Sequence, residues 1–276
     1  MSNSIDLTIG LPVYNEEDKI NEVLEYIFSQ DYKKFKLIIS DNASEDKTYE
    51  ICEKWLKKQK NMELIKQKNK LNINENFYFI YSKVNTKYFM WVAADDKRSK
   101  DYIQKNIDFL NNNQDYIASS SENSIEMSDY NIRKVNFSIE GSKSHRYVKF
   151  LENCFYSHGV FYSIFKHIDL SKTEKYLNYM AWDWTVNLTI LKNGNFKRIK
   201  DGFFFSSHGG ISTKSEYLYN SKTNKFDKIL PFFKFMIFYF NFYLKTEYNF
   251  RNFFRSIILF LKIHVNYIKK YIHNNK

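Results

Sequence analysis

The feature that most constrains the fold is an alternation of short apolar runs with helical patterns across residues 5–112. Apolar side chains such as Ile20, Val23 and Leu24 recur with the spacing of one helix face, which predicts helices between the apolar runs. Pro12 predicts the end of the first strand, because proline cannot donate to a central ladder. Strands joined by helices of this length predict a mostly parallel sheet with right-handed crossovers. The apolar runs that predict buried strands lie at residues 7–11, 35–39, 62–65 and 88–92.

The rest of the chain is less regular and ends in an aromatic, helical region. Short strand patterns occur at residues 196–199 and 203–207, and a helix pattern occurs at residues 182–192. Beyond Ser221 the pattern is helical to the last residue. We expect an α/β domain and a helical appendage, which divide the chain into residues 1–220, with halves at 1–112 and 113–220, and residues 221–276.

The charge of the chain is strongly basic, and the excess is concentrated in the tail. The formal net charge is +11. Residues 231–276 contain eight Lys or Arg residues and a single acid, Glu247. An excess of this size predicts an anionic partner, which could be a nucleotide phosphate, a membrane surface or a nucleic acid.

Cysteine usage and hydropathy limit where the protein is expected to work. The only cysteines, Cys52 and Cys154, exclude a disulfide framework and favour a reducing cytosol. The N-terminus lacks a basic segment followed by an apolar one, so we expect no signal peptide. The longest uncharged apolar run, residues 235–244, is shorter than the roughly 18 residues that a spanning helix needs. We therefore expect a cytoplasmic protein.

Acidic residues follow two of the predicted strands at the edge where parallel sheets bind ligands. Asp41 follows the second strand, and Asp95 and Asp96 follow the fourth. A carboxylate after the fourth strand could hold Mg²⁺ or Mn²⁺ beside a nucleotide diphosphate. The Asp41 carboxylate could accept hydrogen bonds from a base or ribose. Taken alone, each acid could equally be a turn residue or a helix cap.

Three segments, in order, resemble the signature of family 2 glycosyltransferases with the GT-A fold. The resemblance covers residues 5–112 strongly and residues 176–212 loosely. It implies an α/β GT-A fold, a Rossmann-like and mostly parallel sheet flanked by helices, with the helical appendage added at the C-terminus. It also implies transfer of a sugar from a nucleotide diphosphate sugar to an acceptor hydroxyl. The segments are Pro-Val-Tyr-Asn-Glu-Glu at 12–17, Ser-Asp-Asn-Ala-Ser-Glu-Asp at 40–46, and Tyr-Phe-Met-Trp-Val-Ala-Ala-Asp-Asp at 88–96.

The resemblance assigns donor-binding roles to residues at these strand ends. Asp95 matches the last acid of the family's Asp-x-Asp motif and would bind Mn²⁺ or Mg²⁺, while Asp96 would support it or face the sugar. Ala93 stands where the family carries the first acid, which puts strict metal dependence in question. The implied nucleotide-sugar-binding residues are Pro12, Val13, Tyr14, Glu16, Asp41, Asn76, Ala94, Asp95 and Asp96.

A second motif, Ala-Trp-Asp-Trp at residues 181–184, resembles the family's acceptor-side acid motif and implies that Asp183 is the general base. An inverting displacement needs a group that takes the proton of the attacking hydroxyl. The flanking tryptophans could stack on sugars, or pack around the acid and raise its pKa by desolvation. Asp183 could instead only cap the following helix, and Asp169 and Asp201 are the other candidates for the base.

The histidines differ in what they predict. His208 lies in Ser-Ser-His-Gly-Gly at residues 206–210, where the family often has a histidine near the metal or pyrophosphate. The resemblance therefore implies a metal ligand at His208, although a lone histidine is also a common surface or packing residue. We expect His145, His158 and His167 to be structural, because they show no ligand spacing.

The aromatic and basic tail has two interpretations. Its helices could lie on an anionic leaflet at the inner face of the plasma membrane, which would hold the protein beside a lipid-linked acceptor. They could also cap the α/β domain or mediate oligomerisation. Tail residues at helical spacing include Phe250, Phe254 and Ile258, with Arg251 and Arg255 between them.

The expected partners are a nucleotide diphosphate sugar, UDP-linked by default, and a hydroxyl of a glycan or lipid-linked acceptor, in bacterial surface polysaccharide synthesis such as that of lipopolysaccharide. One alternative is a nucleotidyltransferase, but that class needs a Gly-rich basic loop after the first strand, where this chain is acidic. A non-enzymatic nucleic-acid-binding protein is the other alternative. The acids at the ligand edge argue against binding of nucleic acid.

Overall fold

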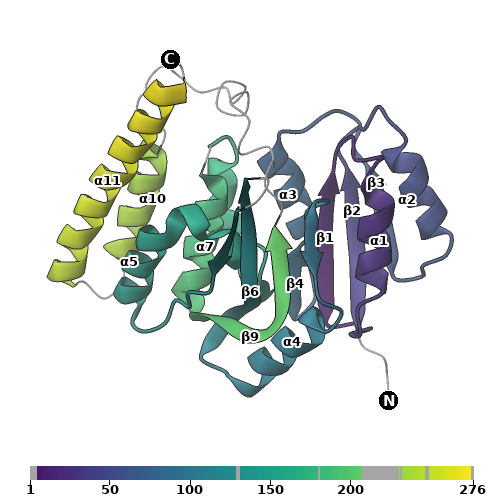
Figure 1. Ribbon diagram of the computed structural model, residues 1–276, viewed down its shortest axis with the longest axis horizontal. Helices are drawn as coiled ribbons and strands as arrows, with labels where there is room; N and C mark the ends of the chain where they lie inside the picture. Colours follow the sequence, from purple (N-terminus) through teal and green to yellow (C-terminus); the bar gives the residue numbers. More distant parts are fainter. Residues whose placement is uncertain are drawn as a thin grey trace.

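The computed structural model describes residues 5–128, 131–179, 181–206, 230, 232–245 and 249–274. A twisted sheet crosses the molecule, with helices packed on its faces (Figure 1). The first three strands and their helices lie at one end, and the two C-terminal helices lie at the other. The predicted α/β architecture with a helical C-terminal region is confirmed.

One nine-stranded mixed sheet organises the described part of the chain, in the order β3-β2-β1-β4-β8-β6-β9-β5, with β7 paired to β6. Its first half is parallel, because β3, β2, β1 and β4 all run the same way. β8 then runs antiparallel to both β4 and β6. The strands are β1 (Leu7–Val13), β2 (Phe35–Asp41), β3 (Met62–Lys66), β4 (Tyr88–Trp91), β5 (Asp96–Arg98), β6 (Tyr116–Ser128), β7 (Asn131–Val135), β8 (Ile164–Lys166) and β9 (Asn195–Ser206).

The helices pack their apolar faces on the sheet and on one another. In α1, for example, Ile20, Val23 and Leu24 are buried, as their spacing predicts. The helices are α1 (Ile20–Phe28), α2 (Thr48–Leu56), α3 (Ile73–Tyr81), α4 (Tyr102–Asn112), α5 (Lys143–Asn153), α6 (His158–Phe161), α7 (Trp182–Asn193), α10 (Phe233–Tyr243) and α11 (Phe250–Asn274), with short 3₁₀ turns η1 (Cys154–Tyr156) and η2 (Ser171–Tyr176).

Two predictions about strands were wrong. β1 does not end at Pro12 but continues to Val13. The pairing of β1 with β4 stops at Gly10, so the missing N–H of Pro12 costs no ladder bond on that side. The two strands predicted at residues 196–207 are one strand, β9, because β6 pairs with it on both sides of residues 200–202. Gly202, at φ 71, allows the extra residues to bulge there.

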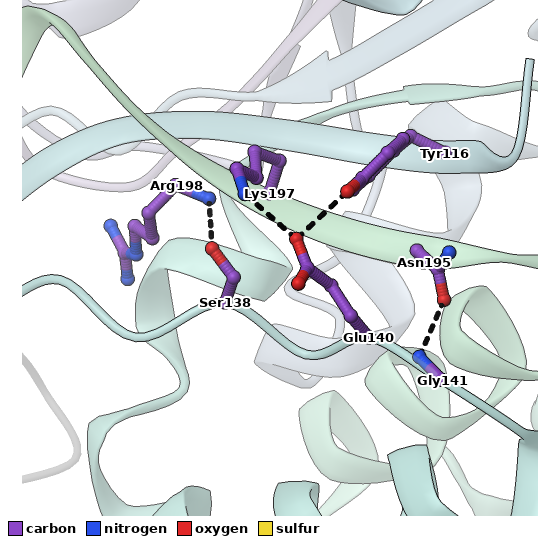
Figure 2. A network of polar contacts seen from close by, with 7 residues as sticks. All are labelled: Tyr116, Ser138, Glu140, Gly141, Asn195, Lys197 and Arg198. Carbon is purple, nitrogen blue, oxygen red and sulfur yellow. Dashed lines mark hydrogen bonds and ion pairs between the residues drawn. The ribbon is translucent and has the colours of Figure 1, made fainter. Parts of the chain in front are cut away.

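The start of α5 is fastened to the sheet by a polar network (Figure 2). The Glu140 carboxylate accepts hydrogen bonds from the Tyr116 hydroxyl and the Lys197 ammonium, each at 2.8 Å. The Gly141 N–H donates to Asn195 Oδ1 at 3.1 Å. Residues 138–141 are therefore held against β6 and β9, which fixes where α5 and the segment after it lie.

The C-terminal helices pack on the α/β domain and on each other. The hydroxyls of Tyr239 in α10 and Ser256 in α11 lie 2.6 Å apart. Asn252 donates to Ser144 of α5 at 3.2 Å, and Arg255 pairs with Glu152. Across the described residues, no helix has the length and apolarity to cross a membrane. The predicted boundary between residues 220 and 221 lies outside the described residues.

Candidate active site

Parallel pairing brings the predicted ligand-binding segments together at one edge of the sheet. Val13, at the end of β1, pairs with Asp41, at the end of β2. β4 runs parallel to β1 on its other side, so Asp95 follows at the same edge. The carboxyl ends of adjacent parallel strands form the crevice where α/β sheets bind ligands.

The loops after β1 and β2 are joined by hydrogen bonds that define one rim of this edge. Asn15, at φ 52, accepts from the Glu45 N–H and donates its own N–H to Ser44 Oγ at 3.0 Å. The Glu16 N–H lies 2.7 Å from Thr48 Oγ1. This cross-linking sets the positions of the predicted pocket residues Tyr14 and Glu16 before any ligand arrives. The Tyr14 ring also lies under the Lys70 ammonium, 3.6 Å from its centroid.

The Asp41 side chain is fully buried, and only one of its two carboxylate oxygens accepts a hydrogen bond from the described residues. Its Oδ1 accepts from the Ser44 N–H at 2.9 Å. Its Oδ2 is buried with no hydrogen-bond partner among the described residues. A buried acceptor left without a donor costs about 1–3 kcal/mol, so this oxygen fits a ligand that brings an N–H or O–H.

Asn76 supports the site. Its Oδ1 accepts from Ser40 Oγ at 2.6 Å, and its Nδ2 donates to the Ser40 carbonyl at 3.2 Å. The Ser40 hydroxyl also accepts from Gln67 at 2.9 Å. The buried amide thus holds the end of β2, and the contact of Asn76 with sugar or phosphate stays a prediction.

The acids after β4 occupy different environments. Asp96 is buried and pairs with Arg98 at 3.3 Å, with both side chains 2% exposed. Burial raises the pKa of Asp96 to about 7, and the Arg98 guanidinium opposes that rise. Asp95 is only partly buried. Of the two roles predicted for Asp96, the pair with Arg98 favours support of Asp95 over contact with the sugar.

Tyr162 shows that the two predicted motifs converge. Burial raises the pKa of its phenol well above the usual value, and the charges of Asp96, Asp95 and Asp183 raise it further, in that order. These three acids therefore lie within electrostatic reach of one tyrosine, although Asp183 is more than 80 residues from Asp95 and Asp96 in sequence. No sequence pattern marks Tyr162, because a tyrosine in the short turn between α6 and β8 resembles a core residue.

Asp183 lies in the first turn of α7 but does not cap it, since the N-cap position is Ala181. Burial raises the pKa of Asp183 to about 7, and hydrogen bonds from the backbone N–H groups of Trp184 and Asp183 oppose that rise. Trp182 and Trp184 are both buried, and Trp184 stacks on Phe232 at 4.8 Å. Both tryptophans therefore belong to the core, and Trp182 packs edge to face with Trp91 and Phe161. The other candidates, Asp169 and Asp201, are exposed.

His158 is nearer to the site than the sequence predicted. Burial lowers its pKa, the Asp95 charge raises it, and the Arg198 charge lowers it. His158 therefore lies within electrostatic reach of both Asp95 and Arg198. No ligand spacing marks it in the sequence, because α6 brings it to the site only through tertiary packing. The predicted metal ligand His208 lies outside the described residues.

Arg198 is a second residue that the sequence did not indicate. It projects from β9 away from the Glu140 network (Figure 2). Its Nη1 donates to the Ser121 carbonyl at 3.0 Å, while Nε and Nη2 are buried without partners among the described residues. Burial lowers the pKa of Arg198 to about 10. Gly159 makes room for the guanidinium, because a Cβ there would lie 1.8 Å from Nη2.

The residues at this edge fit a divalent cation that a substrate helps to hold. The described residues include no group of three or more His, Cys, Asp or Glu side chains that could hold a metal ion alone. Mg²⁺ commonly uses one or two protein carboxylates and completes its shell with phosphate oxygens and water. Burial raises the pKa of Glu16, its ion pair with Lys19 at 3.6 Å opposes the rise, and the Asp95 charge adds to it, so Glu16 lies within electrostatic reach of Asp95.

This combination of a half-parallel sheet, a ligand edge lined by acids and a helical C-terminal region defines a GT-A fold, as solved structures show. PcManGT, a mannosyltransferase from Pyrobaculum calidifontis solved with GDP-Man and Mn²⁺, matches with a TM-score of 0.58. It is 14% identical, and the match covers 93% of this chain and 70% of that one. S. aureus TarS 1-349 in complex with UDP-GlcNAc matches with a TM-score of 0.55 at 16% identity, over 92% of this chain and 79% of that one.

The family model of glycosyl transferase family 2 matches residues 8–170, so the chain belongs to that family. A Methanococcus voltae relative, dolichyl N-acetyl-alpha-D-glucosaminyl phosphate 3-beta-D-2,3-diacetamido-2,3-dideoxy-beta-D-glucuronosyltransferase, is 32% identical over 37% of this chain and 33% of its own length. The abequosyltransferase RfbV of Salmonella typhimurium is 32% identical over 35% of this chain and 30% of its own length. The matched segments span 14% to 38% of the curated relatives.

Proposed function

We propose that this protein is an inverting glycosyltransferase, which moves a sugar from a nucleotide diphosphate sugar to a hydroxyl of a glycan or lipid-linked acceptor. One observation carries the proposal: Asp95, at the donor edge of the sheet, and Asp183, at the start of α7, both lie close enough to Tyr162 to raise its pKa. Family membership favours this reaction over the nucleotidyltransferase and nucleic-acid-binding alternatives.

The donor would lie across the carboxyl ends of β1, β2 and β4. Asp41 Oδ2 would accept a hydrogen bond from the nucleobase, which would satisfy its buried lone pairs. The rim residues Pro12, Val13, Tyr14 and Glu16 would line the pocket, and Ala94 would face the diphosphate. UDP is the default base, supported by the TarS complex with UDP-GlcNAc, and the GDP-Man complex of PcManGT makes GDP the alternative.

Asp183 would take the proton of the attacking hydroxyl. A base works best when its pKa lies near the working pH, and burial places the pKa of Asp183 at about 7. The fixed position of this acid follows from α7, whose residues from Trp184 to Leu191 are all buried. The hydroxyl would then attack the anomeric carbon from the face opposite the leaving diphosphate, which inverts the configuration.

A divalent cation, Mn²⁺ or Mg²⁺, would be held by Asp95, with Glu16 near enough to contribute. The bound ion would supply neutralisation of the negative charge that gathers on the departing diphosphate. Asp96 would fix the local backbone through its buried pair with Arg98. His208 remains a predicted ligand of this ion.

The outer face of α11 would place the protein on an anionic membrane, at the inner face of the plasma membrane. α11 contains no acidic residue, and Arg251 and Lys262 are exposed beside its apolar stripe, while the exposed Arg255 pairs with Glu152 of α5. Like charges on two copies of α11 would repel each other, whereas anionic headgroups would attract them. The stripe is made of Phe250, Phe254, Ile258, Leu261, Val265 and Ile268, all exposed.

Membrane contact and the names of the relatives together support an acceptor in surface polysaccharide synthesis. The relatives are named as transferases acting on a dolichyl-phosphate-linked sugar and as an abequosyltransferase. An acceptor carried on a lipid would be presented at the surface on which α11 lies.

A thermal-shift screen of UDP-, GDP- and dTDP-sugars, with and without Mn²⁺, tests the proposed reaction. A ligand that binds only the folded state raises its apparent stability. We expect one nucleotide class to raise the melting temperature, and to do so more strongly with Mn²⁺. If no nucleotide sugar shifts the transition under either condition, the proposed reaction is wrong.

A further inference from the structure

A second cavity lies away from the acids of the candidate active site. Its volume is about 740 Å³, and it is formed by η2, the last turn of α7 and one side of α10. None of the residues predicted to bind the donor contributes to it. We call it the lysine groove, and its lining is Ser171, Lys172, Glu174, Lys175, Tyr176, Lys192, Phe238, Asn241, Phe242 and Lys245.

The charge of the lysine groove is positive. Four lysines line it, and Glu174 is the one acid among the lining residues. Glu174 accepts a hydrogen bond from the Tyr78 hydroxyl at 3.4 Å. The charges of Lys172 and Lys192 also help to lower the pKa of Asp169, so this acid lies near the groove. The positive charges still outnumber the acids by two.

The floor of the lysine groove is aromatic. Tyr176 and Phe238 are buried and pack edge to face, with centroids 4.8 Å apart. Phe242, which is partly exposed, lies 4.3 Å from Phe238 and 5.3 Å from the Lys192 ammonium. Asn241 is exposed at the same surface and offers an amide for hydrogen bonds. An apolar ring surface beside a few polar groups is typical of small-molecule sites.

The cations of the groove indicate which anion it would bind. All four are lysines, and no arginine lines the cavity. Lysine ammonium groups bind anions, phosphate among them, as compact point charges. The groove therefore fits phosphate groups attached to a body that can lie on the aromatic floor.

α7 connects the lysine groove to the proposed base. Asp183 lies in the first turn of this helix and Lys192 in its last. Nine residues separate the two positions by about 13 Å along the axis and, at about 3.6 residues per turn, place their side chains on opposite faces of α7, so a ligand that reaches both must pass around the helix. Because α7 is buried along its length, the groove and the base keep a fixed separation.

We propose that the lysine groove binds a phosphorylated saccharide, the part of the acceptor that lies beyond the hydroxyl receiving the new sugar. The identification of this ligand as an acceptor rests on the proposed function. The binding of a phosphorylated saccharide is independent of transfer. The lysines hold the phosphates, and Phe242 and Asn241 contact the sugar rings.

Calorimetric binding of phosphorylated maltooligosaccharides to the full chain, without donor, tests the proposal. The unphosphorylated oligosaccharides, inorganic phosphate and phosphatidylglycerol vesicles are the comparison probes. Loss of several exposed charge contacts weakens binding by about tenfold or more, so the triple variant Lys172→Gln, Lys192→Gln, Lys245→Gln should bind the phosphorylated probe at least that much more weakly. The matched control removes three exposed lysines of the other end of the molecule, Lys54, Lys57 and Lys58, and should bind like the unchanged protein.

Four results would overturn the proposal. The first three are equal binding of the phosphorylated and unphosphorylated oligosaccharides, unchanged binding in the triple variant, and inorganic phosphate binding as tightly as the phosphorylated saccharide. Loss of vesicle binding in the triple variant, without binding of any saccharide, would assign the groove to lipid headgroups and also overturn it. If no nucleotide sugar binds in the thermal-shift screen but the phosphorylated saccharide binds as expected here, the proposed function is wrong and the proposal for the lysine groove stands.

Discussion

Replacing Asp183 with asparagine should stabilise the protein while removing its activity. Asparagine has nearly the same shape but carries no charge, so it does not incur the cost of burying a carboxylate. The pKa of Asp183 rises from 3.8 to about 7 in the folded state. At about 1.4 kcal/mol per unit, this rise corresponds to about 4 kcal/mol of lost stability when the carboxylate is ionised.

The pH dependence of this effect has a definite sign. Above about pH 7, Asp183 is ionised in both the folded and unfolded states, so the folded protein bears the full cost. As the pH falls from 7 toward 4, the folded state holds the proton more tightly, and the cost disappears. The stability gained by Asp183→Asn should therefore be about 2–4 kcal/mol at pH 8 and near zero at pH 4.

Urea unfolding of both proteins between pH 4 and pH 8.5 measures this difference. The same samples are assayed for transfer, where loss of a general base costs about 10²–10⁴ in rate. The exposed runner-up, Asp169→Asn, is the matched control and should keep activity. Because hydrogen bonds with Ser171 lower the pKa of Asp169, its replacement should lower stability at pH 8, opposite in sign to Asp183→Asn, and this loss should shrink only as the pH falls to about 4. A stability difference for Asp183→Asn that stays constant with pH would refute the reasoning, as would retained turnover.

Three further predictions concern residues around the site and on α11. Arg98→Met leaves Asp96 buried without its partner, so we expect a loss of about 3 kcal/mol in urea unfolding at pH 8 and a smaller loss at pH 5, where Asp96 is protonated in the folded state. Gly159→Ala places a methyl group against the Arg198 guanidinium and should cost about 1–3 kcal/mol in thermal unfolding. Leu261→Glu introduces a charge on the exposed stripe of α11 and should weaken sedimentation with phosphatidylglycerol vesicles without lowering the melting temperature.

Each of these has a matched control. Arg98→Met combined with Asp96→Asn should recover most of the lost stability, and no recovery would show that the pair is not the cause. Gly159→Ala should become nearly neutral in an Arg198→Met background, unless another contact limits the site. Leu56→Glu adds the same charge at an exposed apolar position of α2 and should leave vesicle binding unchanged, so equal losses in both variants would reject α11 as the docking face.

The parallel half of the sheet was predictable because its signal is local. Each strand there is a short run of buried apolar residues, and each following helix repeats its apolar residues on one face. Asp41 and Asp95 were placed correctly at the ligand edge because the carboxyl ends of parallel strands meet. The end of β1 was wrongly predicted at Pro12 because proline cannot donate a hydrogen bond within a sheet. That rule does not apply here, since the pairing of β1 with β4 already ends at Gly10.

The second half of the site was less predictable because it depends on tertiary packing. His158 belongs to the short helix α6 and Tyr162 to the turn that follows it. Their sequence resembles ordinary core, and tertiary packing brings them to the acids. Arg198 is buried without an acidic partner among the described residues. This contradicts the general rule that charges are paired when buried, so no sequence pattern indicated it. The role of Asn76 was also not predictable from local sequence, because its hydrogen-bond partner Ser40 lies 36 residues earlier in the chain.

The central claim is that Asp95 holds a divalent cation that binds the diphosphate of the donor. The most direct test is a calorimetric titration of UDP or GDP, whichever the thermal-shift screen selects, into the unchanged protein and Asp95→Ala, with and without Mn²⁺. We predict that Mn²⁺ strengthens nucleotide binding to the unchanged protein by about tenfold or more, equivalent to about 1.4 kcal/mol, and that Asp95→Ala abolishes this gain. Nucleotide binding that is the same with and without Mn²⁺, or an equal gain in Asp95→Ala, would contradict the claim.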